Sequence, residues 1–178
     1  MAQALERWDP VILSAQAAAG KMYFMMMFTS KPLEPGTPAP PFICPDERGR
    51  VFILNQQRGK KVVLVFYPAD DTPVCTKQLC ELRDHYDEIR KTGAVVFGVN
   101  PGDGESHKRF QEKHKLPFPL LVDAGKRVAK LYKCGGWLVK RTVYIIDEQG
   151  VIRYARRGRP PVSELLEALR SIGAPAPA

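Results

Sequence analysis

A buried strand that leads directly into a cysteine-bearing helix is the feature that most constrains this chain. Residues 62–66 are continuously apolar and rich in β-branched side chains, which is typical of a central strand covered on both faces. The strand ends before Pro68, which cannot donate a hydrogen bond to a neighbouring strand. Thr72 then has the residue type of a helix N-cap, and Pro73 that of a first helical residue. The sequence therefore predicts that a helix starts at Pro73, after a short turn.

Cys75 falls in the first turn of this predicted helix. At that position, backbone N–H groups without helical partners and the positive end of the helix dipole favour a thiolate over a thiol. The thiolate is the nucleophilic form of cysteine. A free cysteine is also a common small core residue, so a reactive role for Cys75 depends on the residues that accompany it.

The remaining sequence alternates strands and helices. We predict a hairpin over 42–54, a helix over 73–90, a strand over 94–100, a helix over 105–114, a short strand over 117–123, a short helix over 126–132, a hairpin over 141–155 and a closing helix over 162–172. This order predicts an α/β fold in which helices flank a central mixed β-sheet.

The length of 178 residues, with 44% hydrophobic residues, is enough for one complete core. We predict one domain over 36–173, an N-terminal extension of uncertain structure over 1–35 and a flexible tail over 174–178. The apolar cluster at 22–28 is too short to span a membrane and lacks a following cleavage site for a signal peptide. We therefore expect a cytoplasmic protein that has no membrane partner.

The charged residues, cysteines and histidines argue against nucleic-acid binding and against a zinc site. The net charge is +8, but the basic clusters contain no series of interleaved aromatic residues of the kind that stacks bases, so we expect no nucleic-acid partner. The four cysteines form no C-x-x-C pair and no cluster with histidine, which argues against a zinc site. His85, His107 and His114 lie among charged residues on predicted helices, and we expect all three to be solvated.

The pattern Pro68-x-x-x-Thr72-x-x-Cys75, with Arg141 opening a later strand, resembles the peroxiredoxin signature. Cys80, five residues after Cys75, narrows the resemblance to the peroxiredoxin Q or bacterioferritin-comigratory group, and the similarity extends over roughly residues 33–172. It implies a thioredoxin-like fold and a thiol-dependent peroxidase that reduces hydrogen peroxide and organic hydroperoxides. It also implies a monomer without metal, haem or flavin cofactor, recycled by thioredoxin or a similar dithiol reductant.

The resemblance assigns a role to each residue of the motif. Cys75 is the peroxidatic nucleophile, and Cys80 resolves it through an intramolecular disulfide. Thr72 positions the peroxide, because a hydroxyl can both donate and accept a hydrogen bond. Pro68 shields the pocket from water. Arg141 is a permanent cation that stabilises the thiolate and orients the peroxide.

The spacing of the two cysteines has a mechanical consequence. Residues five apart on an intact helix have Cα atoms about 8–9 Å apart on different faces, whereas a disulfide needs about 4.4–6.8 Å. Cys75 and Cys80 can therefore bond only if the helix unwinds locally. Cys134 remains an alternative resolving residue. The sequence also departs from the family at Val74, where relatives usually have glycine, and at Gln78, where many have glutamate.

Two other functions remain open from the sequence. A general thiol–disulfide oxidoreductase would normally carry the C-x-x-C spacing, which is absent here. A non-catalytic redox sensor on the same fold would oxidise at Cys75 without turnover. Catalytic peroxide consumption distinguishes the peroxidase from both.

Overall fold

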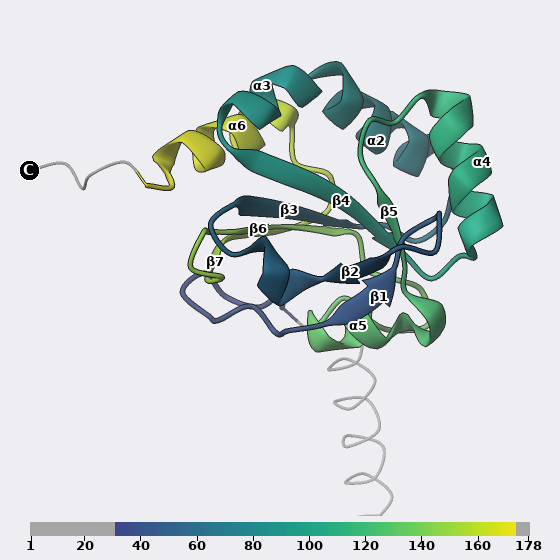
Figure 1. The fold of residues 1–178 in the computed structure, drawn as a ribbon, viewed down its shortest axis with the longest axis horizontal. Coiled ribbons are helices and arrows are strands. Elements are labelled where there is room, and N and C mark those ends of the chain that lie inside the picture. Colours follow the sequence, from purple (N-terminus) through teal and green to yellow (C-terminus); the bar gives the residue numbers. More distant parts are fainter. Residues whose placement is uncertain (1–30, 174–178) are drawn as a thin grey trace, which may run out of the picture. The chain divides into compact units, whose positions relative to one another are not determined.

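The computed structural model describes residues 31–173 (Figure 1). The predictions for 1–35 and 174–178 lie outside this range, except for residues 31–35. The elements are β1 (Ile43–Pro45), β2 (Val51–Ile53), η1 (Leu54–Gln57), β3 (Lys61–Phe66), α2 (Pro73–Asp84), α3 (Tyr86–Lys91), β4 (Ala94–Asn100), α4 (Gly104–His114), β5 (Leu120–Val122), η2 (Ala124–Lys126), α5 (Arg127–Leu131), β6 (Thr142–Ile146), β7 (Ile152–Arg157) and α6 (Val162–Ser171).

A five-stranded sheet in the order β5-β4-β3-β6-β7 forms the centre of the fold. β3 pairs in parallel with β4 and antiparallel with β6, so the predicted mixed sheet is confirmed. The side chains of β3 alternate between two cores: Val62, Leu64 and Phe66 enter one, and Val63 and Val65 enter the other. Burial on both faces explains why this strand is continuously apolar.

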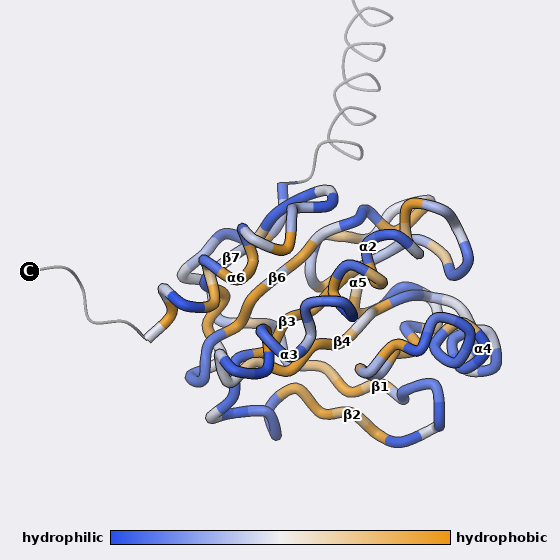
Figure 2. The backbone as a smooth tube through the Cα atoms, turned by 90° about the horizontal axis from the view of Figure 1, so that it is seen from above, coloured by the Kyte–Doolittle hydropathy of each residue, from blue (hydrophilic) through white to orange (hydrophobic). Residues whose placement is uncertain are grey.

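The two cores correspond to two covering layers. Helices α2, α3, α4 and α6 cover one face of the sheet, and the β1–β2 hairpin with α5 covers the other (Figure 1). Hydrophobic backbone positions follow the strands, whereas α4 is largely hydrophilic (Figure 2). None of the helices between residues 31 and 173 is long and apolar enough to cross a membrane.

The predicted helix over 73–90 is two helices. α2 ends at Asp84 and α3 begins at Tyr86, because the backbone at His85 leaves the helical region (φ −109°, ψ 15°). The His85 ring nitrogen Nδ1 lies 2.9 Å from the carbonyl oxygen of Glu81, where it competes with the helical backbone for that acceptor. The ring and the backbone N–H of His85 thus share one acceptor at the point where the helix is interrupted.

One buried carboxylate organises the turn between β6 and β7. Asp147 accepts hydrogen bonds from the backbone N–H groups of Gln149 and Val151 and from Nε of Arg153. Burial by itself raises the pKa of Asp147, but these hydrogen bonds and the charge of Arg153 outweigh it and hold the pKa below the ordinary 3.8.

Asp147→Asn is expected to lower the free energy of unfolding at neutral pH by about 1–2 kcal/mol. The unfolded chain binds the proton more tightly than the folded chain, so the carboxylate stabilises the fold above the ordinary pKa of 3.8. This contribution disappears as the pH falls through the lower folded-state pKa. Urea unfolding of both proteins along an acid pH series checks this, and a deficit independent of pH would contradict it.

Candidate active site

Cys75 lies in the first turn of α2, just beyond the end of β3. Thr72 is the N-cap residue, Pro73 is the first helical residue, and the Thr76 N–H donates to the Thr72 carbonyl at 2.9 Å. The predicted helix start is therefore confirmed. The Cys75 side chain is fully buried and belongs to the core beneath the helices. Its sulfur lies where the helix dipole favours negative charge.

Arg141 contacts the sulfur directly. It precedes β6, whose first residue, Thr142, pairs with Phe66 at the end of β3. This antiparallel register brings Arg141 to the end of β3, close to Cys75, although 66 residues separate the two in sequence. The Arg141 Nη2 atom donates to Cys75 Sγ at 3.1 Å, and Nη1 donates to Gln78 Oε1. The guanidinium is therefore oriented on both branches, and a permanent cation lies against the sulfur.

Thr72 and Pro68 lie in the turn between β3 and α2. The Thr72 backbone has the extended conformation of an N-cap (φ −84°, ψ 143°), but its side chain makes no capping hydrogen bond. The hydroxyl donates instead to the Ala69 carbonyl, at 3.4 Å, so the side chain turns back over the loop. Pro68 is partly exposed at the exit from β3. Both residues precede Cys75 on the chain, between the end of β3 and the start of α2.

Cys80 lies on the same unbroken helix as Cys75. It is half-buried, and all four cysteines are free thiols. Because α2 is continuous from Pro73 to Asp84, the separation of about 8–9 Å that follows from helix geometry applies, and the two sulfurs cannot bond in this conformation. Val74, in the turn that would have to unwind, is 55% exposed.

The other two cysteines have environments that suppress reactivity. Burial, with a smaller contribution from Asp123, raises the pKa of Cys44 to about 12. Burial also raises the pKa of Cys134, whose thiol donates to the Tyr132 carbonyl at 3.2 Å. Since the thiolate is the reactive species, both side chains are suited to packing rather than to nucleophilic attack.

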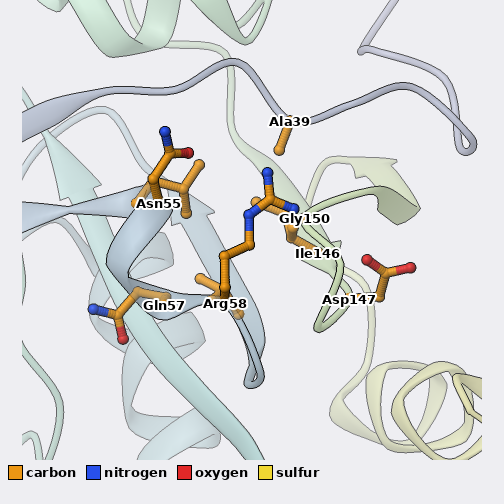
Figure 3. A pocket seen from close by; sticks show the side chains of 9 residues that line it. Ala39, Asn55, Gln57, Arg58, Ile146, Asp147 and Gly150 are labelled. Atoms are coloured by element: carbon orange, nitrogen blue, oxygen red, sulfur yellow. The ribbon is translucent and has the colours of Figure 1, made fainter.

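A small cavity lies away from these residues. It measures about 10 Å³, is lined by Leu54, Val62 and Ile146 among others, and has room for at most about one water molecule. The Arg58 side chain extends across it towards Ala39 and Gly150 (Figure 3). The φ of Gly150 is +76°, which favours glycine, and a Cβ there would lie 1.9 Å from Arg58 Nη1 and displace the end of that side chain. Val62 lies near the start of β3, whereas Cys75 follows the end of this strand, so the cavity and Cys75 lie at opposite ends of β3.

The structure also contains a buried polar cluster that the sequence did not predict. The expectation that His107 is solvated is wrong: it is fully buried, and its Nδ1 lies 2.7 Å from Asp70 Oδ2. The same carboxylate accepts hydrogen bonds from the Tyr67 and Ser106 hydroxyls. His107 precedes buried Phe110 by about one turn of α4, and this spacing is the sequence feature that indicates a shared buried face. The charged residues on either side of His107 favour the opposite interpretation.

Comparison with known proteins identifies the family to which this chain belongs. Residues 35–155 match the model of the AhpC/TSA family, and the chain belongs to this family. It is a thiol-dependent peroxidase with a thioredoxin-like fold.

Its relatives are of the peroxiredoxin Q and bcp type. The chain is 42% identical over 145 residues to the chloroplastic peroxiredoxin Q of Sedum lineare, covering 77% of this chain and 78% of the relative. It is 40% identical over 131 residues to a putative peroxiredoxin bcp of Coxiella burnetii, covering 67% and 85%. The crystal structure of peroxidoxin BcpB from Mycobacterium tuberculosis is 30% identical, with a TM-score of 0.74, and covers 80% of this chain and 99% of that one.

Proposed function

We propose that Cys75 is the peroxidatic nucleophile of this peroxidase. The observation that carries the proposal is the 3.1 Å contact between Arg141 Nη2 and Cys75 Sγ at the start of α2. The thiolate attacks one oxygen of the hydroperoxide in line with the O–O bond, and an S–O bond forms as the O–O bond breaks. The other oxygen leaves and takes a proton, giving water or an alcohol, while the cysteine becomes a sulfenic acid.

Three residues support this step. The Arg141 guanidinium stabilises the attacking sulfur and the charge that develops on the leaving oxygen. The Thr72 hydroxyl holds the peroxide, since it can both donate and accept a hydrogen bond. Pro68 shields the reacting atoms from water at the exit from β3.

Cys80 is the resolving residue in this proposal. Its thiol attacks the sulfenic acid of Cys75, a disulfide forms and water is released. The reaction requires the first turns of α2 to unwind, because the intact helix keeps the two residues apart. A thioredoxin-type dithiol then reduces the disulfide by thiol–disulfide exchange.

Hydrogen peroxide and small organic hydroperoxides are the proposed substrates, and a monomer is the proposed active species. We also propose a cytoplasmic location, supported by the likeness to a bacterial bcp protein and by four unpaired cysteines, which suit a reducing compartment. The chloroplastic relative makes the location worth testing directly by cell fractionation. Size-exclusion chromatography of the reduced protein checks the monomer.

Cys80→Ser is expected to convert a catalyst into a protein that reacts once. Cys75 still becomes a sulfenic acid with one equivalent of hydrogen peroxide, but no Cys75–Cys80 disulfide forms and turnover with thioredoxin falls by about 100-fold or more. Disulfide mapping and dimedone trapping by mass spectrometry provide the measurement. Cys134→Ser is the matched control and keeps both the disulfide and the turnover. A Cys75–Cys134 bond in the wild type would assign resolution to Cys134 and remove the need for unwinding.

A further inference from the structure

The loop that carries Pro68 and Thr72 is attached to α4 by buried side-chain contacts, in addition to its continuation into α2. Asp70 lies in the middle of this loop, with a side chain only 7% exposed. Its Oδ1 accepts a hydrogen bond from the Tyr67 hydroxyl at 2.8 Å, and its Oδ2 accepts from Ser106 Oγ at 2.7 Å. The side chain of His107, whose Nδ1 lies 2.7 Å from the same Oδ2, has no solvent exposure.

These contacts favour an ionised, fixed carboxylate. Burial by itself raises the pKa of Asp70, but the hydrogen bonds from His107, Ser106 and Tyr67 outweigh it and leave the pKa below its ordinary value. A buried carboxylate with three donors has little freedom to move, because any displacement leaves charge without partners.

The cluster continues into the edge of the sheet. The Asn100 side chain, at the end of β4, donates to the Tyr67 carbonyl at 3.0 Å and accepts from the Gly102 N–H. A Cβ on Gly102 would lie 2.8 Å from Asn100 Oδ1 and 2.9 Å from His107 Cε1. The absence of a side chain at Gly102 therefore leaves room for the imidazole in the orientation in which it contacts Asp70.

A second attachment joins the same loop to the other end of α4. Asp71 has a left-handed backbone (φ +51°), which is unfavourable for a residue with a side chain. Its carboxylate pairs with Lys113 Nζ at 2.7 Å and lies 3.4 Å from His114 Nε2. This pair is exposed and contributes little by itself, so Asp70 and His107 provide the main attachment.

We propose that Asp70 and His107 are positioning residues for the peroxide reaction, because their contact holds the Pro68–Thr72 loop against α4. This contact gives the loop that carries Pro68 and Thr72 an attachment outside α2, whose first turns must unwind later in the cycle. This inference rests on the proposed role of Cys75. Arg141 reaches the sulfur from β6, so loosening the loop should leave the sulfur's intrinsic reactivity unchanged and should impair only steps that use the loop.

Two reactions of the same sulfur separate positioning from general damage. Reaction with hydrogen peroxide uses the loop, whereas alkylation by iodoacetamide is a displacement at carbon that does not. We expect His107→Leu to lower the peroxide rate constant by roughly 10–100-fold, while the alkylation rate stays within about threefold. His107→Asn places an amide donor near the former Nδ1 and is expected to restore the peroxide rate to within about threefold. Lys108→Leu, an exposed position on the same helix, is the matched control.

The outcomes are distinct. An unchanged peroxide rate in folded His107→Leu, a parallel loss of both rates, or an equal loss in His107→Asn would each overturn the proposal. If His107→Leu does not fold, Ser106→Ala decides: a peroxide rate lowered by about threefold to tenfold with normal alkylation supports positioning, and no loss overturns it. Failure of the proposed function would appear separately, as wild-type protein that does not react with peroxide or as Cys75→Ser that reacts normally.

Discussion

Cys75→Ser is expected to abolish peroxide consumption, with a fall of at least about 1,000-fold in the second-order rate constant. A serine hydroxyl is not ionised at neutral pH, so the Arg141 guanidinium would face a neutral, weakly nucleophilic oxygen. The substitution is nearly isosteric at a fully buried position, and the Arg141–Gln78 hydrogen bond remains available. Loss of activity should therefore occur in a folded protein, which circular dichroism and a thermal melt can verify.

Cys44→Ser provides the comparison for this variant. Its thiol is also buried, but its raised pKa of about 12 keeps it protonated, so the peroxide rate should stay within about threefold of the wild type. Stopped-flow measurement of the initial peroxide reaction is the direct assay. A folded Cys75→Ser protein that retained a tenth of the rate would show that another group reacts, and it would remove Cys75 from its proposed role.

Arg141→Met is expected to lower the peroxide rate constant by about 100–1,000-fold, as the loss of one preorganised charged donor at a reacting centre typically does. The methionine retains part of the arginine's apolar stem but lacks both the charge and the donors. Arg141→Lys retains the charge and loses the planar fork that reaches Cys75 Sγ and Gln78 Oε1 together. We therefore expect the peroxide rate constant of Arg141→Lys to lie between those of the wild type and Arg141→Met, at about 10–100-fold below the wild type.

Arg159→Met is the control for the arginine series, because Arg159 forms only a partly exposed pair with Glu81 at 3.5 Å. Its rate should stay within about twofold of the wild type. A lysine variant with wild-type activity would show that the charge at residue 141 is sufficient. A methionine variant with wild-type activity would exclude the arginine from the reaction.

The features that the sequence predicts best are those with local causes. Residues 62–66 are apolar because both faces of β3 are buried, and Thr72-Pro73 mark a helix start through backbone chemistry that acts over a few residues. Arg141 is different. Its contact with Cys75 depends on the pairing of β6 with β3, which no local pattern reveals, so its selection relied on resemblance to a family.

The features that the sequence missed depend on side-chain competition or on tertiary packing. The helix is interrupted at His85, whose ring lies against the Glu81 carbonyl, whereas helical periodicity alone continues through this residue. His107 is buried because α4 packs over the end of β4, where Asn100 and the loop at Asp70 lie. A histidine beside a lysine and an arginine has no sequence feature that identifies such a partner 37 residues away.

The antiparallel insertion of β6 beside β3 also determines when the chain acquires its chemistry during synthesis. Cys75 is synthesised 66 residues before Arg141, and the two side chains come into contact only after β6 has paired with β3. A nascent or half-assembled chain therefore has a cysteine without its cation. Long-range pairing of this kind belongs to the later events of folding. Under the roles proposed for Cys75 and Arg141, the fast reaction with peroxide would therefore arise only once the sheet is complete.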